Sequence, residues 1–370
     1  MNSLFRVSLA ALLSLSCLIA YGDKAGAEPT SANQAERSKL VPTRKLELLH
    51  APEVHRELEL SSEQIDSLEN LFQEIDGIWF RSRLLPFPQQ RQTVLDLQQR
   101  VDRWFQEKAS ASQRERLWQL EFQAQGTRGL LRPDVASKLG LREPQTQRLL
   151  TAARKAVEAQ QALQAATRTG KESQELTDTY QKAVKREHAE SQAILEPDQQ
   201  RKLASLIGAP FDTSKLRRIY PMAPEFAEVT HWINSDPLTL QQLRGKVVLI
   251  HFYAFQCHNC HANFEHYRRW HEQSSDDEVV VIGIQTPETR MERNVDAIRQ
   301  AAAERELRFP ILVDLESKNW DAWANTMWPT IYVVDRDGYI RFWWQGELNW
   351  KGATVDQQID TLIAELLAEK

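Results

Sequence analysis

The fold is decided by the stretch Val247-Val248-Leu249-Ile250-His251-Phe252-Tyr253-Ala254, followed after two further residues by Cys257-His258-Asn259-Cys260. Nearly all of the first eight residues are apolar, β-branched or aromatic, which is typical of a strand buried on both faces of a sheet. A helical pattern begins at the cysteines. We therefore expect Cys257 at the start of a helix, where unpaired backbone N–H groups and the helix dipole favour an anion.

The two cysteines have different predicted roles. A depressed pKa would leave Cys257 as a thiolate, which is the attacking species in disulfide exchange, and Cys260, one helical turn deeper, would resolve the mixed disulfide. A protonated His258 between them would stabilise the thiolate further, and we place His258 on the substrate-binding surface. A pair three residues apart cannot staple a large fold, so the pair indicates redox chemistry or metal binding.

The segments after this stretch alternate between strand and helix patterns. We expect strands at 279–284, 309–313, 330–334 and 339–344, the last two joined by a hairpin turn at Arg336-Asp337-Gly338. Helices are expected at 294–306 and 320–326, and a last helix from a capping box of Thr354 and Gln357. This order predicts an α/β domain with a central mixed sheet covered by helices on both faces.

The region before it, residues 46–210, is predicted to be an all-α domain. It is rich in Gln, Glu, Arg, Ala and Leu, and Ser61 with Gln64 forms a capping box before a helical run. The region also echoes itself. Leu60, Gln64 and Leu68 return 81 residues later as Leu141, Gln145 and Leu149, and Ala109, Gln113 and Leu117 return 86 residues later as Leu195, Gln199 and Leu203. These offsets favour a tandem duplication.

The first 27 residues have the pattern of a secretory signal peptide. Arg6 precedes an apolar run from Val7 to Ala20, and the small residues Ala25-Gly26-Ala27 end the segment. The chain then divides into a flexible lead-in (28–45), the helical domain (46–210), a Pro-rich linker (211–236) and the α/β domain (237–370). We expect an exported, periplasmic protein; the alternatives are an uncleaved membrane anchor or a lipidated Cys17.

The charge is nearly balanced, because 46 basic and 51 acidic residues give a net charge of -5 over 370 residues. No global field favours nucleic acid, so we expect no nucleic-acid partner.

Several motifs outside the cysteine pair resemble those of thioredoxin-like redoxins of the TlpA type, namely Gly245 to Ile250, Trp328-Pro329-Thr330 and Asp335 to Gly338. The match is closer to the C-terminal redoxin domain of DipZ-type cytochrome c biogenesis proteins, carried by Cys257-x-Asn259-Cys260, Gln285-Thr286-Pro287-Glu288 and Glu292-Arg293-Asn294. It covers residues 224–350. The resemblance implies that Pro329 is a cis-proline that faces the cysteines and binds substrate backbone, and that the substrates are exported proteins. Trp328 is the neighbouring candidate for substrate contact.

The helix starts of the all-α region resemble, over about ten residues per copy, those of small exported helical proteins of the Spy and CpxP type. Amphipathic faces packing into a bundle explain the same pattern without any chemistry.

Three positions depart from the thioredoxin pattern. Gln256 replaces the usual Trp, Glu265 replaces a helix-kinking Pro, and His251 stands where thioredoxins bury an acid beneath the cysteines. His251 is either a general base that accepts the Cys260 proton or a hydrogen-bonded core histidine.

Three other chemistries would use residues of the same region. Cys257-x-x-Cys260-His261 also fits c-type haem attachment, and His251, His258, His261, His266 and His271 cluster near the thiols as candidate metal ligands. A peroxiredoxin would need Thr where Ala254 stands. We favour none of the three, and expect neither a cofactor nor a physiological metal site.

The working hypothesis is therefore a thiol–disulfide oxidoreductase with protein thiol or disulfide substrates and a membrane or periplasmic redox partner. Its helical domain would bind another protein or self-associate. The alternative is a chaperone-like or partner-binding helical protein with a redox-sensing accessory domain.

Overall fold

A computed structural model describes residues 36–37, 39–168, 173–273 and 278–369. The predicted signal peptide, Cys17 included, lies outside these residues. The chain divides into two compact units. The helical unit comprises the described residues up to Gln64 together with Pro86–Leu216, and the sheet unit comprises Ile65–Leu85 and Arg217 onward.

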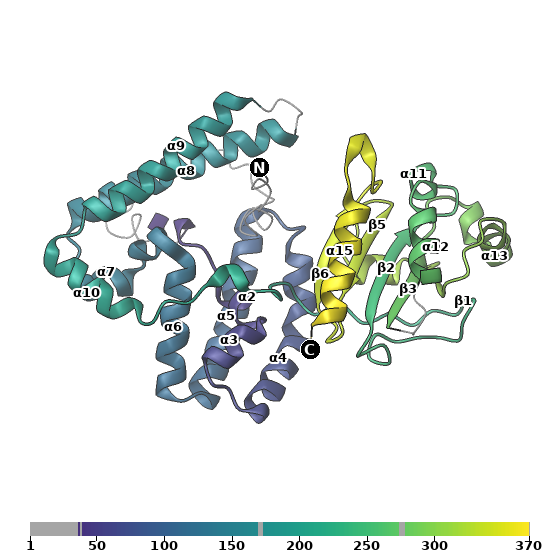
Figure 1. Cartoon of the computed structure of the whole chain (residues 1–370), viewed down its shortest axis with the longest axis horizontal. Coiled ribbons are helices and arrows are strands. Elements are labelled where there is room, and N and C mark those ends of the chain that lie inside the picture. Colours follow the sequence, from purple (N-terminus) through teal and green to yellow (C-terminus); the bar gives the residue numbers. More distant parts are fainter. Residues whose placement is uncertain (1–35, 38, 169–172, 274–277, 370) are drawn as a thin grey trace. The chain divides into compact units, whose positions relative to one another are not determined.

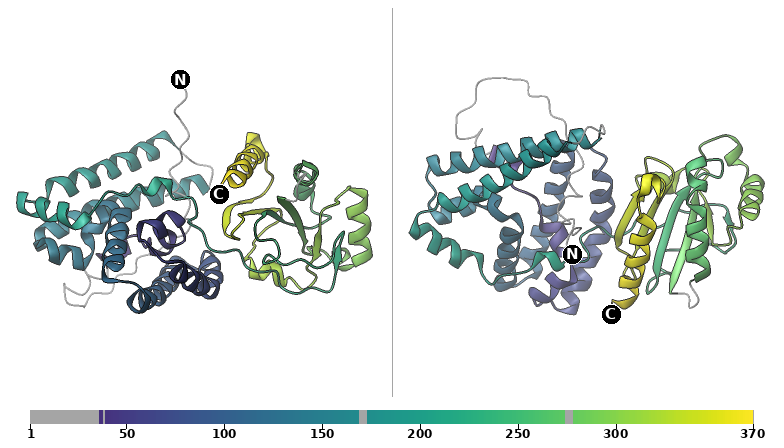
Figure 2. Two further views of the ribbon diagram at one scale, coloured as in Figure 1. Left: turned by 60° about the horizontal axis from the view of Figure 1, so that its bottom comes forward. Right: turned by 45° about the horizontal axis from the view of Figure 1, so that its top comes forward.

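The helical unit confirms the all-α prediction. Its α-helices are α2 (Lys45–Leu49), α3 (Pro52–Glu57), α5 (Phe87–Lys108), α6 (Ala111–Gln125), α7 (Pro133–Leu139), α8 (Glu143–Arg168), α9 (Gln174–Ala193) and α10 (Pro197–Ile207), with 3₁₀ turns at Gly126–Leu131 and Thr213–Lys215. The long helices α8 and α9 lie side by side (teal in Figures 1 and 2). Part of the predicted flexible lead-in is held by this unit, because Gln125 Nε2 donates to the carbonyl of Pro42 at 3.1 Å.

Two pairs of glutamines repeat the same hydrogen bonds. Gln64 Nε2 donates to Lys108 O at 2.8 Å and Gln113 Nε2 donates to Glu59 O at 3.1 Å. In the second pair, Gln145 Nε2 donates to Ile194 O at 2.8 Å and Gln199 Nε2 donates to Gly140 O at 3.1 Å. Within each pair the side-chain amides also bond to each other.

Every partner in the second pair lies 81 or 86 residues after its counterpart, as in the sequence echo. Each glutamine also bonds the backbone N–H three residues before it, at Ser61, Ser110, Arg142 and Glu196. Each glutamine amide thus hydrogen-bonds the backbone both at the start of its own helix and near the end of another helix. We propose on this basis that the region contains a tandem duplication.

In the described residues of the sheet unit, six strands form one mixed sheet in the order β1-β4-β3-β2-β5-β6. They are β1 (Trp232–Ile233), β2 (Val247–Tyr253), β3 (Val279–Gln285), β4 (Ile311–Val313), β5 (Thr330–Val334) and β6 (Ile340–Gln345). β2 pairs in parallel with β3 and antiparallel with β5. β2 is thus central and buried along its whole length, as its apolar run predicts.

One face of the sheet is covered by helices from after the cysteines. α12 (Phe264–Gln273), α13 (Val295–Glu304) and α15 (Val355–Ala368) contribute Tyr267, Ile298 and Ile359 to a core shared with Leu249 and Val281.

The last helix does start near the expected place, but the predicted cap is wrong. Thr354 makes no side-chain hydrogen bond to the first turn, and its φ of -122° and ψ of 44° lie outside the extended region typical of a capping residue.

The other face is covered by α14 (Lys318–Ala322) and by α4 (Ser62–Ser82), a helix from much earlier in the chain. Phe80 of α4 packs edge-on against Tyr332 and Trp343, with centroids 5.9 and 6.5 Å apart. Arg83, just after α4, donates to the carbonyls of Trp323 and Ala324. Although α4 lies within the predicted helical domain, Ile65–Leu85 thus belongs to the sheet unit.

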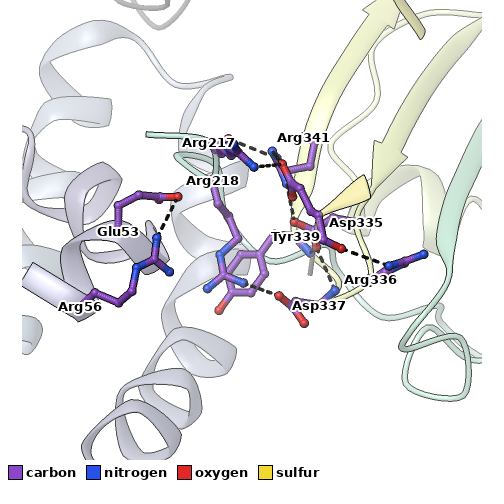
Figure 3. Close-up of polar contacts among 10 residues, drawn as sticks. Glu53, Arg56, Arg217, Arg218, Asp335, Arg336, Asp337, Tyr339 and Arg341 are labelled. Carbon is purple, nitrogen blue, oxygen red and sulfur yellow. Dashed lines mark hydrogen bonds and ion pairs between the residues drawn. The ribbon is translucent and has the colours of Figure 1, made fainter. Parts of the chain in front are cut away.

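The hairpin between β5 and β6 forms where the sequence predicts it. Gly338 N donates to Asp335 O at 2.9 Å, and Gly338 has a φ of 81°, which favours glycine. The Asp335 carboxylate accepts from Tyr339 N and from Arg341 (Figure 3). Arg341 also pairs with Glu369, which lies beyond α15. These bonds tie the hairpin to the C-terminal helix.

Candidate active site

Cys257 lies between β2 and the short helix α11 (His258–His261). Figure 1 shows α11 at one end of the sheet. It is the N-cap residue of α11, with an extended φ of -69° and ψ of 113°. Its side chain is partly exposed, whereas Cys260 is 0% exposed, and both thiols are free. The predicted order, an accessible first cysteine and a buried second one, is therefore present.

The environments of the two thiols separate their pKa values. A hydrogen bond from the Cys260 thiol, aided by the backbone N–H groups of Cys260 and Asn259, lowers the pKa of Cys257 to about 7. Burial raises the pKa of Cys260. At neutral pH a substantial fraction of Cys257 is thus thiolate while Cys260 stays protonated and can donate to it.

The loop before Cys257 is held from two sides. The backbone N–H of Gln256 donates to Glu292 Oε1 at 2.7 Å. On the other side, the imidazole Nε2 of His261 bonds the carbonyl of Phe255 at 2.7 Å. The His261 side chain therefore helps to fix the position of this loop.

His251 lies on the central strand and is 0% exposed. Its ring stacks on those of Tyr267 and Tyr253, with centroids 3.7 and 4.9 Å apart, and no described residue hydrogen-bonds either ring nitrogen. Burial lowers the pKa of His251 to about 3. An imidazole of this pKa is a weak base, so these surroundings favour a core-packing role over the general-base role.

The neighbouring strand β3 leaves room for the His251 ring, because its residue beside His251 is a glycine. Gly283 of β3 is its register partner, and a Cβ there would lie 3.3 Å from His251 Nε2 and 3.0 Å from Tyr253 and Phe309.

The predicted substrate-binding residues differ in exposure. The peptide between Trp328 and Pro329 is cis, as the resemblance implies, and the contact of Pro329 with substrate backbone stays a prediction. Trp328 is partly buried and its ring lies on Trp320, with centroids 4.1 Å apart. His258 is exposed beside Cys257. Trp328 therefore has a packing contact with Trp320, whereas His258 is exposed to solvent.

The first active-site helix is interrupted although Glu265 replaces the usual Pro. α11 ends at His261 and α12 begins at Phe264. Between them the buried Asn263 donates through Nδ2 to Gly346 O and accepts through Oδ1 from Leu348 N. The break between the two helices thus coincides with hydrogen bonds from the Asn263 side chain to the loop at residues 346–348.

Among the described residues, no group of three or more His, Cys, Asp or Glu side chains is placed to hold a metal ion.

Comparison with known proteins matches the region of this site. Residues 220–343 match the AhpC/TSA family. The chain is 30% identical over 152 residues to the thiol-disulfide oxidoreductase YkuV of Bacillus subtilis, a match that spans 41% of this chain and 98% of YkuV. The chain belongs to the thioredoxin-like thiol–disulfide oxidoreductases.

Other relatives of this thioredoxin-like oxidoreductase match similar shares of the chain. Protein DipZ of Mycobacterium bovis is 33% identical over 148 residues, which are 39% of this chain and 20% of DipZ, so the chain spans about a fifth of that relative. A solved structure described as a thioredoxin-like protein in the oxidized form is 28% identical, with 42% of this chain and 99% of that chain covered and a TM-score of 0.36.

Two features of this oxidoreductase were missed as site residues. In the sequence Glu292 stands out only as part of a motif, yet it is buried and its carboxylate accepts from the N–H of the residue before Cys257. Its polar, aperiodic surroundings in the sequence gave no sign of burial. Met291 is 58% exposed and lines, with Phe255, Gln256 and His261, a shallow groove of about 460 Å³ beside α11.

No helix in the described ranges combines the length and the apolar character needed to cross a bilayer.

Proposed function

We propose that this protein is an exported thiol–disulfide oxidoreductase that exchanges disulfides with protein substrates through Cys257 and Cys260. The observation that carries the proposal is the pairing of a partly exposed thiol, whose pKa is lowered to about 7, with a buried thiol that hydrogen-bonds it. Export rests on the signal-peptide pattern of residues 1–27. A role in cytochrome c maturation rests on the resemblance alone.

The reaction needs only these two sulfurs and a substrate disulfide. The Cys257 thiolate attacks one substrate sulfur, forming a mixed disulfide and releasing the other substrate sulfur as a thiolate. Cys260 then passes its proton to the released substrate thiolate and attacks the Cys257 sulfur, so the second substrate sulfur leaves as a thiolate and the Cys257–Cys260 pair is left oxidised. Two electrons pass from the pair to the substrate, and the reverse sequence oxidises a substrate dithiol.

Ala254 favours disulfide exchange over peroxide chemistry. A peroxiredoxin would carry a Thr hydroxyl three residues before its reactive cysteine. Here that position is a fully buried Ala whose carbonyl accepts the N–H of Cys257 at 3.1 Å.

Reduction of insulin by the full chain, with dithiothreitol as the electron source, tests the proposal. Wild type should accelerate insulin precipitation, and Cys257→Ser should not. Equal rates for the two proteins would contradict it and would favour the chaperone-like alternative. The reduction potential of the pair then decides direction, because a value near about -270 mV indicates a reductant and one near about -120 mV an oxidant.

The helical unit is the proposed partner-recognition or self-association part of the protein. Its repeated glutamine pairs use their amides inside the unit, so recognition would fall to other surfaces of α8 and α9. Sedimentation of the full chain from micromolar to millimolar concentration tests self-association directly. A single monomeric species over that range would leave partner binding as the remaining role.

A further inference from the structure

A buried carboxylate, that of Glu292, hydrogen-bonds the loop that leads into the reactive cysteine. Glu292 is 0% exposed. It accepts three backbone hydrogen bonds, from Gln256 N at 2.7 Å, Glu288 N at 2.8 Å and Thr289 N at 2.7 Å. Burying a carboxylate costs free energy unless such donors replace water, so the three bonds constrain where the carboxylate and its donors lie.

These bonds join two loops that are distant in sequence. Gln256 belongs to the loop between β2 and α11, whereas Glu288 and Thr289 follow β3. The same loops are joined a second time, because Thr289 Oγ1 donates to Gln256 Oε1 at 2.7 Å.

The segment that leads into Cys257 has few free polar groups. His261 bonds the Phe255 carbonyl, and Cys257 N donates to Ala254 O. The N–H of Gln256 is held by Glu292 alone among the described residues. Releasing it would leave the Phe255–Gln256 peptide, the second peptide before the reactive residue, held only through its carbonyl by His261.

We propose that Glu292 is a positioning residue for Cys257: by holding the Gln256 N–H, it aims the Cys257 sulfur at the backbone N–H groups that begin α11. The inference deepens the proposed function and rests on it, since it concerns the thiol that attacks the substrate.

Charge and position predict opposite effects of removing this carboxylate. Loss of a nearby negative charge alone would favour the thiolate and lower the pKa of Cys257. Loss of alignment would weaken the hydrogen bonds from Asn259 and Cys260 and raise it. The sign of the change therefore separates the two roles, and a purely structural role would change stability without moving the pKa.

The test is the rate of iodoacetamide labelling of Cys257 between pH 5 and 9, measured on the reduced full chain by mass spectrometry. In Glu292→Gln the amide offers one acceptor oxygen to three donors. We expect the pKa of Cys257 to rise by about one unit, so that labelling at pH 6 is about tenfold slower. Glu292→Asp, which keeps the charge on a shorter side chain, should move the pKa in the same direction.

The matched control is Glu316→Gln, which removes an exposed carboxylate of the same unit that pairs with Lys318. It should leave the labelling profile unchanged. A Cys257 pKa that is unchanged or lower in a folded Glu292→Gln protein would overturn the inference. The insulin assay on wild type is separate, so failure of the proposed function and failure of this inference give different results.

If circular dichroism shows that Glu292→Gln does not fold, Thr289→Val decides. It removes only the bond to Gln256 Oε1 from an exposed residue. We expect labelling at pH 6 to slow by about threefold, corresponding to half a pKa unit. An unchanged profile in this variant would then count against the inference.

Discussion

The ring of Phe80 packs edge-on against the ring of Tyr332, with centroids 5.9 Å apart. Phe80 is 4% exposed and Tyr332 is 0% exposed. Truncating a buried Phe to Ala costs about 3–5 kcal/mol, so Phe80→Ala should lower the free energy of unfolding of the sheet unit by about that amount. Ile78→Ala on the same helix is the control, because Ile78 is 40% exposed and should change stability little. Equal urea midpoints for the two variants would mean that α4 does not stabilise the sheet.

The same contact changes what is expected of the isolated C-terminal region. A linker at 211–236 predicts that a protein starting near Met222 folds alone. Such a protein lacks α4, so Tyr332 and Trp343 lose the cover of Phe80, and Met222 N loses its bond to Asp76. We expect residues 217–370 to bind a hydrophobic dye and to melt at a higher temperature when a peptide of residues 65–85 is added. No response to the peptide would show that the domain is complete without α4.

His251 should make the protein acid-sensitive. Its pKa is about 3 in the fold and about 6.5 in the unfolded chain. The unfolded chain therefore binds a proton first as pH falls, so the stability that neutral His251 contributes is full above pH 6.5 and is lost toward pH 3. We expect wild type to lose about 1.4 kcal/mol per pH unit from this group over that interval, and His251→Phe to lack that slope. Urea unfolding at pH 7, 5.5 and 4.5 measures both slopes, and equal slopes would mean that His251 titrates normally in the fold.

The activity of a His251 variant separates its two predicted roles. His251→Asn should turn over insulin at the wild-type rate with an unchanged pH profile if the residue only packs the core. A slower rate with a native circular dichroism spectrum would instead support the general-base role.

The exposure difference between the cysteines predicts that Cys257 attacks the substrate and Cys260 resolves the mixed disulfide. Cys260→Ser should trap covalent mixed disulfides with substrate, because the accessible Cys257 survives and the resolving thiol is gone. Cys257→Ser should trap little. Non-reducing gel electrophoresis after incubation with an oxidised substrate protein reads the result. Trapping only in the Cys257 variant would reverse the assignment.

The second glutamine pair should matter more for stability than the first. Gln145 and Gln199 are buried, at 6% exposure each, whereas Gln64 caps an exposed helix start. Gln145→Leu leaves the Ile194 carbonyl and the Gln199 amide without this partner and should cost about 1–3 kcal/mol. Gln161→Leu, at an exposed position of α8, should stay within about 0.5 kcal/mol of wild type. If the two variants unfold at the same urea concentration, the amide pair does not stabilise the unit.

Most of the sheet could be predicted because its strands are short apolar runs between recognisable turns. β2 and β3 begin where the pattern predicts, and the turn at Gly338 lies between β5 and β6. β1, of two residues in the Pro-rich segment, has no pattern of its own and exists through pairing with β4. The predicted cap at Thr354 is wrong because the backbone of Thr354 lies outside the extended region that a capping residue adopts, which the residue types alone do not reveal.

The sequence predicts only those residues of the candidate active site whose position follows from the local strand and helix pattern. Cys257 and Cys260 lie at a strand-to-helix junction that the pattern itself defines. Glu292 and Asn263 act through bonds to backbone groups 36 and 85 residues away, at Gln256 and Leu348. No local periodicity encodes such partners. The packing of α4 on the sheet could not be predicted for the same reason. Its amphipathic pattern indicates that one face is buried but not which part of the chain covers that face.

The distance along the chain between α4 and its sheet has a consequence during synthesis. Arg83 and its partner Tyr332 are 249 residues apart. Ribosomes add about 5–20 residues per second, so roughly 12–50 s pass between the two segments. A single helix is marginal in water on its own, and throughout this interval Phe80 has no strand to cover it. A newly made chain therefore carries an unprotected apolar segment until its last strands emerge, and aggregation or capture by a holding chaperone would have to occur in that time.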